Sequence, residues 1–427
     1  MPEYNDNVDA LIKENDATDW QNLFLQKCGD IETPARWGNP ERPTLDPWVI
    51  KEPYVGGATR VVMERNPYFW QVDTEGNQLP YIDNVLFPID QDVESLILSA
   101  IGGKVDFGLR HIDSPANRPV LAQNREQGDY HFFEAASTGG SNMTISLNLT
   151  HKDPDMRALF NEKDFRVALS LGMNRQEIID TVMLGEGGPW QQGPFENHPY
   201  YHEQIATQYL DYDPDRANEL LDGLGLERGG DGIRRMANGE PVRFQVDVIP
   251  TFDPTWIDSL ELIEQQWAEL GVDIEINPME RTFFYERTSN GNDHDAAIWR
   301  AIGSWVPGEG AGMLAPVGQD NRYAIAWVDW YLSGGEKGEE PPEDVKKRLA
   351  LYDELRGLTD QQARIAKMHE MADIAAEAFE TIGVSRVLPT YGIVKNDLMN
   401  VPESMPSSWS YPTPAPTLPQ TWFWKID

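Results

Sequence analysis

The sequence predicts an α/β fold, because strand-like and helix-like patterns alternate in two separate stretches of the chain. In residues 85–109, a segment with one apolar helical face stands between two apolar runs that suit strands. In residues 242–276, the order is again strand, helix and strand. Since helices that alternate with strands cover the faces of a sheet, we expect layers of helices packed on sheets.

The stretch ERNPYFW (residues 64–70) follows a strand-like VVMER segment and places three aromatic residues behind an Asn-Pro pair. Proline disfavours the helical region for the residue before it, and Asn-Pro is typical of a turn. We therefore expect the strand to end near Asn66. The three rings either pack back on the strand or line a cleft.

The helix expected within residues 85–109 has apolar residues at the spacing of one helical face and is followed by Gly102-Gly103, which ends it. Its apolar positions are Val93, Leu96, Ile97, Ala100 and Ile101. The flanking apolar runs complete a strand–helix–strand unit.

Strands and capped helices are expected between residues 130 and 225. HFFEAAS and NMTISLNLT suit strands, the second by strict alternation of apolar and polar residues, and DFRVALSLGM suits a helix. Asn174, with Glu177 three residues later, predicts the capped start of a helix over QEIIDTVML. Asp213-Pro214 supplies an N-cap and a first-turn proline for DRANELLDGLG.

The second strand–helix–strand unit has the clearest boundaries. VRFQVDVI suits a strand, Asp253-Pro254 starts a helix, Gly271 ends it, and VDIEI resumes a strand. Trp256 and Trp267 lie on this amphipathic helix, so we expect both rings in the core.

The last quarter of the chain is predicted to be mainly helical. GGEKGEEPPED is expected to be a solvated loop, and two helices follow it, KKRLALYDELRGL and QQARIAKMHEMADIAAEAFETI. Thr359 and Gln362 form a capping box before the second helix. The tail SMPSSWSYPTPAPTLPQTWFW is proline-rich and extended, and its tryptophans indicate that it docks on the folded protein.

Composition excludes several classes of function. The 427 residues include 70 acidic and 35 basic ones, and the net charge of −35 repels phosphate backbones, so no nucleic-acid partner is expected. A hydrophobic fraction of 40% with abundant aromatic residues indicates a folded protein of two or three lobes. Cys28 is the only cysteine, which excludes an internal disulfide and a cysteine-based metal site.

No membrane span and no signal peptide are expected in this chain. No apolar run approaches the roughly 18 residues that read as a membrane-spanning helix. Residues 1–25 lack both the basic start and the apolar block of a secretion signal.

The common catalytic and cofactor motifs are missing. Neither a G-x-S-x-G elbow, a phosphate-binding P-loop, a G-x-G-x-x-G turn nor an H-E-x-x-H pair occurs. His198 and His202 have the spacing of two zinc ligands on a helix, but Pro199 opposes a helix there, so surface histidines are the preferred interpretation. With 70 carboxylates, pairs suited to glycoside hydrolysis arise by chance, and composition selects none. We predict no catalytic residue, no metal site and no cofactor.

Five tryptophans fall near glycine, proline or expected strand ends instead of in helical stripes: Trp190, Trp299, Trp305, Trp327 and Trp330. Rings in such places can form flat walls for sugar or peptide ligands. The alternative, preferred for any single one of them, is that the ring packs at the edge of a lobe.

Several blocks in one order resemble the extracytoplasmic solute-binding proteins of ABC importers, family 5, the oligopeptide/dipeptide-binding class. The blocks are RVVMERNPYFW with LPYIDNVLFPI, AIGGKVDFG, ISLNLT, DFRVALSLGMNRQEIIDTVMLGEG, YDPDRANELLDGLGL, and AELGVDIEI before DAAIWR. Each block alone is weak, but their order and spacing are specific, and the likeness covers about residues 45–400. In this family the Arg-Asn-Pro-x-x-Trp block closes a strand of the first lobe, so a structural role is preferred for ERNPYFW.

The resemblance implies a periplasmic-binding-protein-like fold, type II and cluster C-like, with two α/β lobes joined by a hinge. It places lobe one at residues 1–109, lobe two at 112–300, and a return to lobe one with the C-terminal helices and tail at 301–427. Leu109–His111 and Arg300–Ile302 are the expected hinge strands. Family members begin with a signal and a long first part of lobe one that has no match here, so we expect an N-terminally truncated chain that lacks part of its cleft wall.

Ligand binding between such lobes needs aromatic walls and a few aimed polar groups. The residues expected there are Arg110 and His111 at the first hinge, Asn148 after the alternating strand, Trp190 with Gln191 in a loop, and Trp299, Arg300 and Trp305 at the return crossing. Arg110 and His111 are assigned to ligand carboxylate or hydroxyl groups. Arg166, in the FRVAL helix, is expected to be structural.

The function that the resemblance implies is the substrate-binding component of an ABC-type importer. Such a protein binds an oligopeptide or oligosaccharide, closes around it by a hinge motion and delivers it to the transmembrane subunits of the permease. The many tryptophans favour an oligosaccharide. A monomer is expected, periplasmic or extracytoplasmic in its full-length form.

Two alternatives stay open. One is an extracellular glycan-active hydrolase that uses the same tryptophans as sugar platforms, and the other is a truncated remnant without a ligand. Turnover of a substrate would exclude a receptor as the complete account, whereas reversible binding without a product would exclude the hydrolase.

Overall fold

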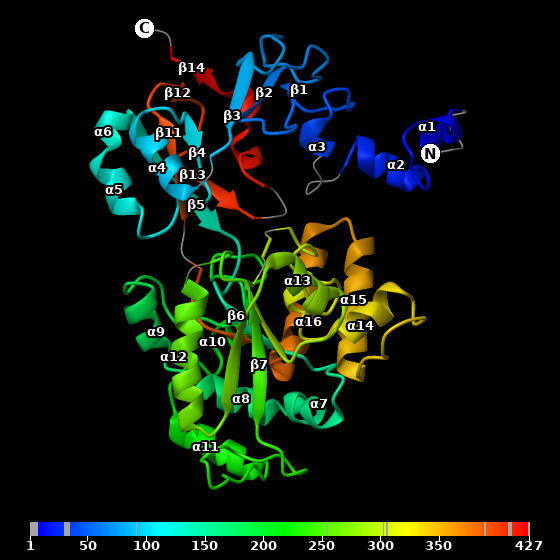
Figure 1. Cartoon of the computed structure of the whole chain (residues 1–427), viewed down its shortest axis with the longest axis vertical. Helices are drawn as coiled ribbons and strands as arrows, with labels where there is room; N and C mark the ends of the chain where they lie inside the picture. The colour runs from blue at the N-terminus through cyan, green and yellow to red at the C-terminus, as the bar shows by residue number, and fades with distance from the viewer. Residues whose placement is uncertain are drawn as a thin grey trace. The chain divides into compact units, whose positions relative to one another are not determined.

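The chain forms two compact units in the computed structural model (Figure 1). Unit 1 contains residues 1–135, 390–405 and 413–427, and unit 2 contains residues 136–389 and 406–412. The structure describes residues 7–29, 35–90, 92–253, 255–301, 303–304, 306–387, 390–408 and 412–425. Each unit contains sheets and helices, so the predicted α/β class is confirmed.

Unit 1 contains a three-stranded sheet in the order β1-β2-β3, a four-stranded sheet in the order β13-β5-β11-β4, and the pair β12-β14. Its strands are β1 (Trp48–Glu52), β2 (Arg60–Arg65), β3 (Asn84–Pro88), β4 (Phe107–Gly108), β5 (Tyr130–Ser137), β11 (Thr390–Lys395), β12 (Leu398–Met399), β13 (Ser404–Ser407) and β14 (Phe423–Trp424). Its helices are α1 (Val8–Glu14), α2 (Trp20–Lys27), α3 (Ala35–Gly38), α4 (Val93–Ile101), α5 (Arg118–Gln123) and α6 (Arg125–Gly128), with short turns η4 (Ala415–Thr417) and η5 (Pro419–Thr421).

The four-stranded sheet of unit 1 lies between two apolar clusters. On one face, Ile97 of α4 packs in a cluster with Ile393 of β11. On the other face, Trp422 packs in a cluster with Phe133 of β5, and its ring lies 4.7 Å from that of Phe107. The predicted helix and the predicted docking of the tail are therefore confirmed.

The first predicted strand–helix–strand unit exists, but its strands belong to different sheets. β3 pairs with β2, whereas β4 pairs with β11, which is almost three hundred residues further along the chain. A local pattern carries no information about such distant pairing.

The ERNPYFW stretch is a turn that ends β2. Asn66 holds the turn with its side chain, which donates to the Asp46 carbonyl at 2.9 Å and accepts from the Tyr68 N–H at 3.0 Å. Only Phe69 is buried, while Tyr68 and Trp70 are 89% and 69% exposed. The structural interpretation of this block is confirmed, with one ring of the three packed.

Unit 2 contains one five-stranded mixed sheet in the order β10-β6-β9-β7-β8. β7 is parallel to β8 and β9, and β6 is antiparallel to β9 and β10. The strands are β6 (Thr144–Leu147), β7 (Arg243–Val248), β8 (Asp273–Pro278), β9 (Ala296–Trp299) and β10 (Ile382–Gly383).

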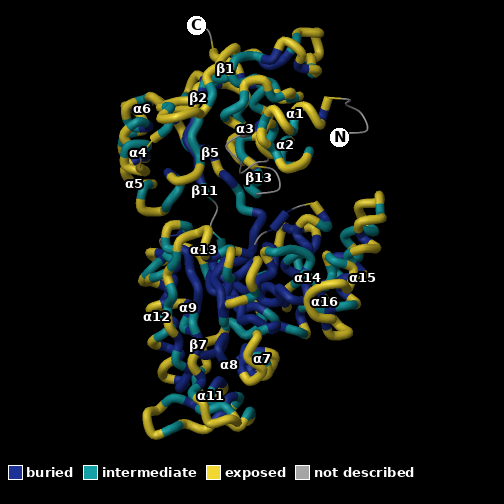
Figure 2. Tube along the Cα trace, turned by 45° about the vertical axis from the view of Figure 1, so that its right-hand side comes forward, coloured by how far each residue is buried: buried dark blue, intermediate teal, exposed yellow. Residues whose placement is uncertain are grey.

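Helices surround this sheet and bury its centre, as the dark tube around β7 and α8 in Figure 2 shows. They are α7 (Pro154–Asn161), α8 (Lys163–Leu171), α9 (Arg175–Val182), α10 (Glu203–Thr207), α11 (Pro214–Gly223), α12 (Thr255–Glu269), α13 (Arg281–Tyr285), α14 (Ile325–Leu332), α15 (Glu343–Gly357) and α16 (Gln361–Ala378), with a π-helical turn η2 (Glu286–Asn290) and the 3-10 turn η3 (Ala311–Met313). Trp256 and Trp267 of α12 are fully buried, as predicted.

Side-chain caps start three of the predicted helices of unit 2, α9, α11 and α16. Asn174 accepts from the Glu177 N–H at 3.2 Å, and Asp213 accepts from the Arg216 N–H at 2.9 Å, as the sequence predicts. The predicted capping box of α16 is wrong by one residue. Asp360 caps this helix by accepting from the Ala363 N–H at 2.8 Å.

The boundaries of the units differ from those of the expected lobes. The chain leaves unit 1 at residues 135–136 instead of near 109–112, because β5 pairs with β11 along its length. Residues 301–387 belong to unit 2, since β10 pairs with β6 and the end of α16 binds Arg166. The expected hinge residue Arg110 therefore lies inside unit 1.

Buried arginines bind backbone carbonyls and carboxylates inside unit 2. Arg166 is buried and donates to the Phe379 and Ala378 carbonyls at 2.8 and 2.9 Å, so its predicted structural role is confirmed. Arg348 is also buried and makes a double ion pair with Glu380, at 2.7 and 2.6 Å. Removing one partner of such a pair leaves a buried charge without compensation.

We predict that Glu380→Gln lowers the free energy of unfolding by about 3 kcal/mol, because Arg348 keeps its charge but loses its closest counter-charge and retains only the more exposed Asp344, at 3.4 Å. Urea unfolding followed by tryptophan fluorescence measures this change. The matched control is Glu219→Gln, which breaks the exposed Arg216–Glu219 pair and is expected to cost less than about 1 kcal/mol. Equal effects of the two substitutions would contradict the prediction.

Candidate functional site

The carboxyl ends of β7, β8, β9 and β10 lie at one edge of the unit 2 sheet, which we call the strand-end edge. β6 begins at the same edge, since Thr144 at its start pairs with Trp299 at the end of β9 and with Gly383 at the end of β10. In open α/β sheets, ligands bind outside the carboxyl ends of the parallel strands. The strand-end edge is therefore the candidate ligand site of unit 2.

Backbone segments continue the sheet pairing beyond this edge. The Ala301 N–H donates to the Ser141 carbonyl at 3.0 Å, and the Val387 N–H donates to the Gly140 carbonyl at 2.9 Å. The segments approach so closely that a Cβ at Gly140 would lie 2.3 Å from the Gln192 carbonyl oxygen. Glycine is required there by this contact.

Trp299 is packed into an aromatic cluster at the strand-end edge. Its ring centre lies 4.6 Å from that of Phe252 and 5.8 Å from that of Phe284, and the Arg322 guanidinium lies 4.1 Å above it. Only 9% of Trp299 is exposed. The cluster fixes the end of β9 and so the position of the next residue, Arg300.

Arg300 presents a guanidinium group at this edge with 43% of its side chain exposed. The group lies 5.0 Å over the Phe252 ring, and its Nη2 donates to Asp253 Oδ2 at 2.9 Å. Asp253 Oδ1 accepts from the Thr255 N–H and hydroxyl at 3.0 and 2.6 Å, at the start of α12. One carboxylate thus joins the helix start to the exposed arginine.

His294 supports the Arg322 side of the cluster. Its Nε2–H donates to the Arg322 carbonyl at 2.9 Å, and burial lowers the pKa of His294 to about 4. The imidazole is therefore neutral near pH 7. Burial also lowers the pKa of the Arg322 guanidinium, which donates to Asp320 and Thr288.

Three other residues expected at a ligand site have their side chains bonded inside unit 2. Asn148 lies at the opposite edge of the sheet, where it donates to the His294 carbonyl at 3.0 Å. Trp190 Nε1 donates to the Gly193 carbonyl at 2.7 Å, and Gln191 bonds Ser170 and the Gly383 N–H. All three are buried, so none is exposed at the strand-end edge.

Trp299 and Arg300 lie together at the strand-end edge of unit 2. Arg110 and His111 are exposed in unit 1, just after β4, with left-handed φ angles of 59° and 64°. Trp305 lies outside the described residues.

Phe252 and Arg322 were not predicted from the sequence, and Asp253 was predicted only as part of the Asp253-Pro254 start of a helix. Asp253 and Arg300 are 47 residues apart in the chain, and no local pattern links them. The nearest available signals were the place of Asp253 at the expected start of a helix and the place of Arg300 at an expected crossing between lobes.

Trp190, Trp299 and Trp327 are buried, so the hypothesis of tryptophan walls is not supported for these three rings, whereas Trp330 is partly exposed. The preferred packing interpretation is confirmed for these three. The prediction of a surface His198 is wrong, since this residue is 5% exposed and its ring centre lies 4.1 Å from that of Tyr200. In the described part of the chain, no group of three or more His, Cys, Asp or Glu side chains could hold a metal ion.

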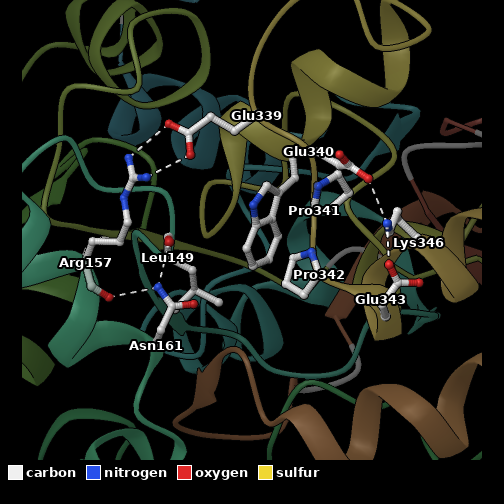
Figure 3. A pocket seen from close by; sticks show the side chains of 10 residues that line it. Leu149, Arg157, Asn161, Glu339, Glu340, Pro341, Pro342, Glu343 and Lys346 are labelled. Atoms are coloured by element: carbon white, nitrogen blue, oxygen red, sulfur yellow. Dashed lines mark hydrogen bonds and ion pairs between the residues drawn. The ribbon is translucent and has the colours of Figure 1, made fainter.

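A separate pocket of about 470 Å³ lies among α7, α14 and the loop before α15 (Figure 3). Its charged groups bind one another: Arg157 pairs with Glu339 at 2.8 Å, and Lys346 pairs with Glu340 at 2.8 Å. Leu149 in its wall follows the carboxyl end of β6, at the opposite edge of the sheet. The pocket is therefore distinct from the strand-end edge.

The chain belongs to the bacterial extracellular solute-binding proteins, family 5, whose middle region matches residues 28–321. This match confirms the predicted resemblance. The proteins of this family are binding proteins and not enzymes. Among the described residues, no helix is long and apolar enough to cross a membrane.

Two curated relatives carry different ligands in their names. The chain is 23% identical to the periplasmic alpha-galactoside-binding protein of Rhizobium meliloti, over 81% of this chain and 50% of that protein. It is 25% identical to di/tripeptide-binding protein 1 of Pseudomonas aeruginosa, over 66% of this chain and 49% of that protein. The chain thus spans about half the length of these relatives.

Solved structures share the fold. The oligopeptide-binding protein OppA is 32% identical, with a TM-score of 0.70 over 100% of this chain and 69% of that one. The periplasmic binding protein MelB of Agrobacterium fabrum C58, solved with stachyose, is 19% identical, with a TM-score of 0.69 over 90% of this chain and 58% of that one. The predicted periplasmic-binding-protein-like fold is confirmed.

We predict that His294 makes the unfolding free energy depend on pH. Its pKa rises from about 4 in the folded state to 6.5 when unfolded, so the unfolded state binds more protons between these values. The contribution of His294 to stability is complete well above pH 6.5 and falls as the pH drops, by about 2.5 kcal/mol between pH 7.5 and 4.5.

Urea unfolding at several pH values tests this prediction, with His294→Gln as the comparison, since glutamine keeps a donor for the Arg322 carbonyl but does not titrate. The variant is expected to lose less stability than the original chain over the same pH range. Identical pH profiles for both proteins would exclude His294 as the cause.

Proposed function

We propose that this chain is the solute-binding component of an ABC importer, or a part of one, and that it delivers its solute to the transmembrane subunits of the permease. The observation that carries the proposal is the family match over residues 28–321, which includes Trp299 and Arg300 of the strand-end edge. That edge offers one exposed, anchored guanidinium group on an aromatic base, which suits reversible recognition of a polar solute.

The solute class proposed at this level is a peptide or an oligosaccharide. The names of the relatives include both di/tripeptides and alpha-galactosides, and each of these relatives is about equally distant from this chain. Arg110, His111 and Trp305 remain predicted ligand contacts, and an extracytoplasmic monomer remains the proposed state.

The hydrogen bonds of Asp253 at the strand-end edge favour binding over hydrolysis. Both oxygens of Asp253 are engaged, one by the start of α12 and the other by Arg300. A general acid or base needs a carboxyl group that can exchange a proton with the substrate, and Asp253 is held away from that role. Asp253 therefore gives no support to the hydrolase alternative.

A thermal-melt screen of the 427-residue chain tests the proposed function. We expect either a short peptide or a galactose-containing oligosaccharide to raise the melting temperature, since a ligand at 100 times its dissociation constant adds about 2.7 kcal/mol to the stability of the folded state. Mass spectrometry of the same samples is expected to find the solute unchanged. A melt that no solute moves would contradict the proposal, and formation of a product would favour the hydrolase.

A further inference from the structure

The pocket among α7, α14 and the loop before α15, which we call the α14 pocket, contains a hydrogen-bond donor without a partner. Trp327 of α14 lines this pocket and is only 7% exposed. Among the described residues, no atom accepts from its Nε1–H, whereas Trp190, Trp256 and Trp267 all donate to backbone carbonyls. This nitrogen is not one of the fully buried polar atoms, so the small open part of the ring includes the donor. Such a donor needs an acceptor from a ligand or from water.

The loop that forms the acidic wall of the α14 pocket is fixed to the helices beside it. The Glu339 N–H donates to the Ala326 carbonyl of α14 at 2.9 Å, and a Cβ at Gly338 would clash with the same carbonyl oxygen. The Glu339 carboxylate binds both terminal nitrogens of Arg157 of α7, at 2.8 and 3.0 Å. The loop therefore holds its carboxylates in place before any ligand arrives.

The charges around the α14 pocket favour a cation. Lys346 Nζ binds Glu340 Oε1 at 2.8 Å and Glu343 Oε1 at 2.5 Å. With the Arg157–Glu339 pair, three carboxylates lie beside two cationic groups, so one negative charge is in surplus. The Oε2 atoms of Glu340 and Glu343 have no partner among the described residues, and these side chains are 64% and 90% exposed. The wall thus offers acceptors to a cation and would repel an anion.

The size and the apolar surface of the α14 pocket suit a small molecule. Its volume of about 470 Å³ lies within the range of roughly 300–1,000 Å³ that is common for ligand pockets. In Figure 3, Pro341 and Pro342 lie between the Arg157–Glu339 pair and Lys346. These prolines give an apolar surface for a short aliphatic stem.

We propose that the α14 pocket is a second binding site and that its ligand is a small organic cation, with an ammonium group and a carbonyl or hydroxyl acceptor joined by an aliphatic stem. The acceptor binds the Trp327 N–H, and the ammonium group binds the open oxygens of Glu340 and Glu343. This inference goes beyond the proposed function, because the pocket is distinct from the strand-end edge and either site can exist without the other.

Calorimetric titration of the 427-residue chain with three matched probes tests the inference. Nα-acetyl-lysinamide carries both the ammonium group and a carbonyl, Nα-acetyl-norleucinamide lacks the charge, and pentylamine lacks the acceptor. We expect Nα-acetyl-lysinamide to bind at least about tenfold more tightly than either of the others. Its affinity should fall as salt is raised, since ions screen an exposed charge pair.

Two substitutions connect this binding to the α14 pocket. Trp327→Phe keeps a ring but removes the N–H, and Glu340→Gln removes one carboxylate at the surface. Each is expected to weaken the binding of Nα-acetyl-lysinamide about fivefold. The matched controls are Trp330→Phe, on the same helix but outside the pocket wall, and Glu219→Gln, which changes an exposed carboxylate of α11. Both controls should leave the affinity unchanged.

A thermal melt of each variant checks that it folds, and Glu340→Gln decides the test if Trp327→Phe does not fold. Binding of Nα-acetyl-lysinamide that the pocket variants weaken and the controls do not would support the site. The inference would be overturned by binding that neither pocket variant changes, by equal affinity for all three probes, or by a dissociation constant above about 10 mM. None of these results bears on the proposed function, which the thermal-melt screen with peptides and oligosaccharides tests separately.

Discussion

The burial of β6 on both faces sets the arrangement of unit 2. Every residue of this strand is buried, so its polar side chains must bond within the unit. Thr144 meets this requirement with the Trp299 carbonyl at 2.8 Å, and Asn148, just past the strand, with the His294 carbonyl at 3.0 Å. These two bonds fix both ends of the neighbouring strand β9. The register that results places Trp299 and Arg300 at the strand-end edge, so the candidate site follows from a requirement of the core.

The acidic chain keeps several arginines inside unit 2, where their guanidinium groups satisfy backbone carbonyls. Arg175 donates to the Ser170 carbonyl near the end of α8, and Arg234 donates to the Leu270 carbonyl just after α12. Helix ends leave carbonyl groups without partners and carry partial negative charge, so a buried cation is stabilised there. Arginine at these positions stabilises the core by binding backbone carbonyls. Arg300 differs because its carboxylate partner occupies one nitrogen and leaves the rest of the fork at the surface.

Local sequence patterns predicted the elements well and their long-range partners poorly. The caps at Asn174 and Asp213 depend on residues three positions apart, which a sequence displays directly. The pairing of β4 with β11 depends on residues almost three hundred positions apart, and no periodicity encodes it. The candidate site shows the same contrast: Trp299 and Arg300 were predicted from resemblance, but whether a ring is open or covered is decided by distant residues. Arg322, for example, covers Trp299 only in the folded unit.

The groups that the strand-end edge offers to a solute are therefore those that remain exposed after folding. Amino-acid composition predicts them poorly. An abundance of tryptophan favours sugars only if the rings keep a free face. An excess of negative charge opposes acidic solutes only if no cation is held at the surface. In unit 2 the rings of Trp299 and Trp190 are covered by arginines, and Asp253 binds Arg300 through one nitrogen and leaves the rest of its guanidinium group at the surface. Since Asp253 also caps α12, the same carboxylate that stabilises the helix start orients the arginine, and the geometry of recognition is set by a bond that the fold already needs.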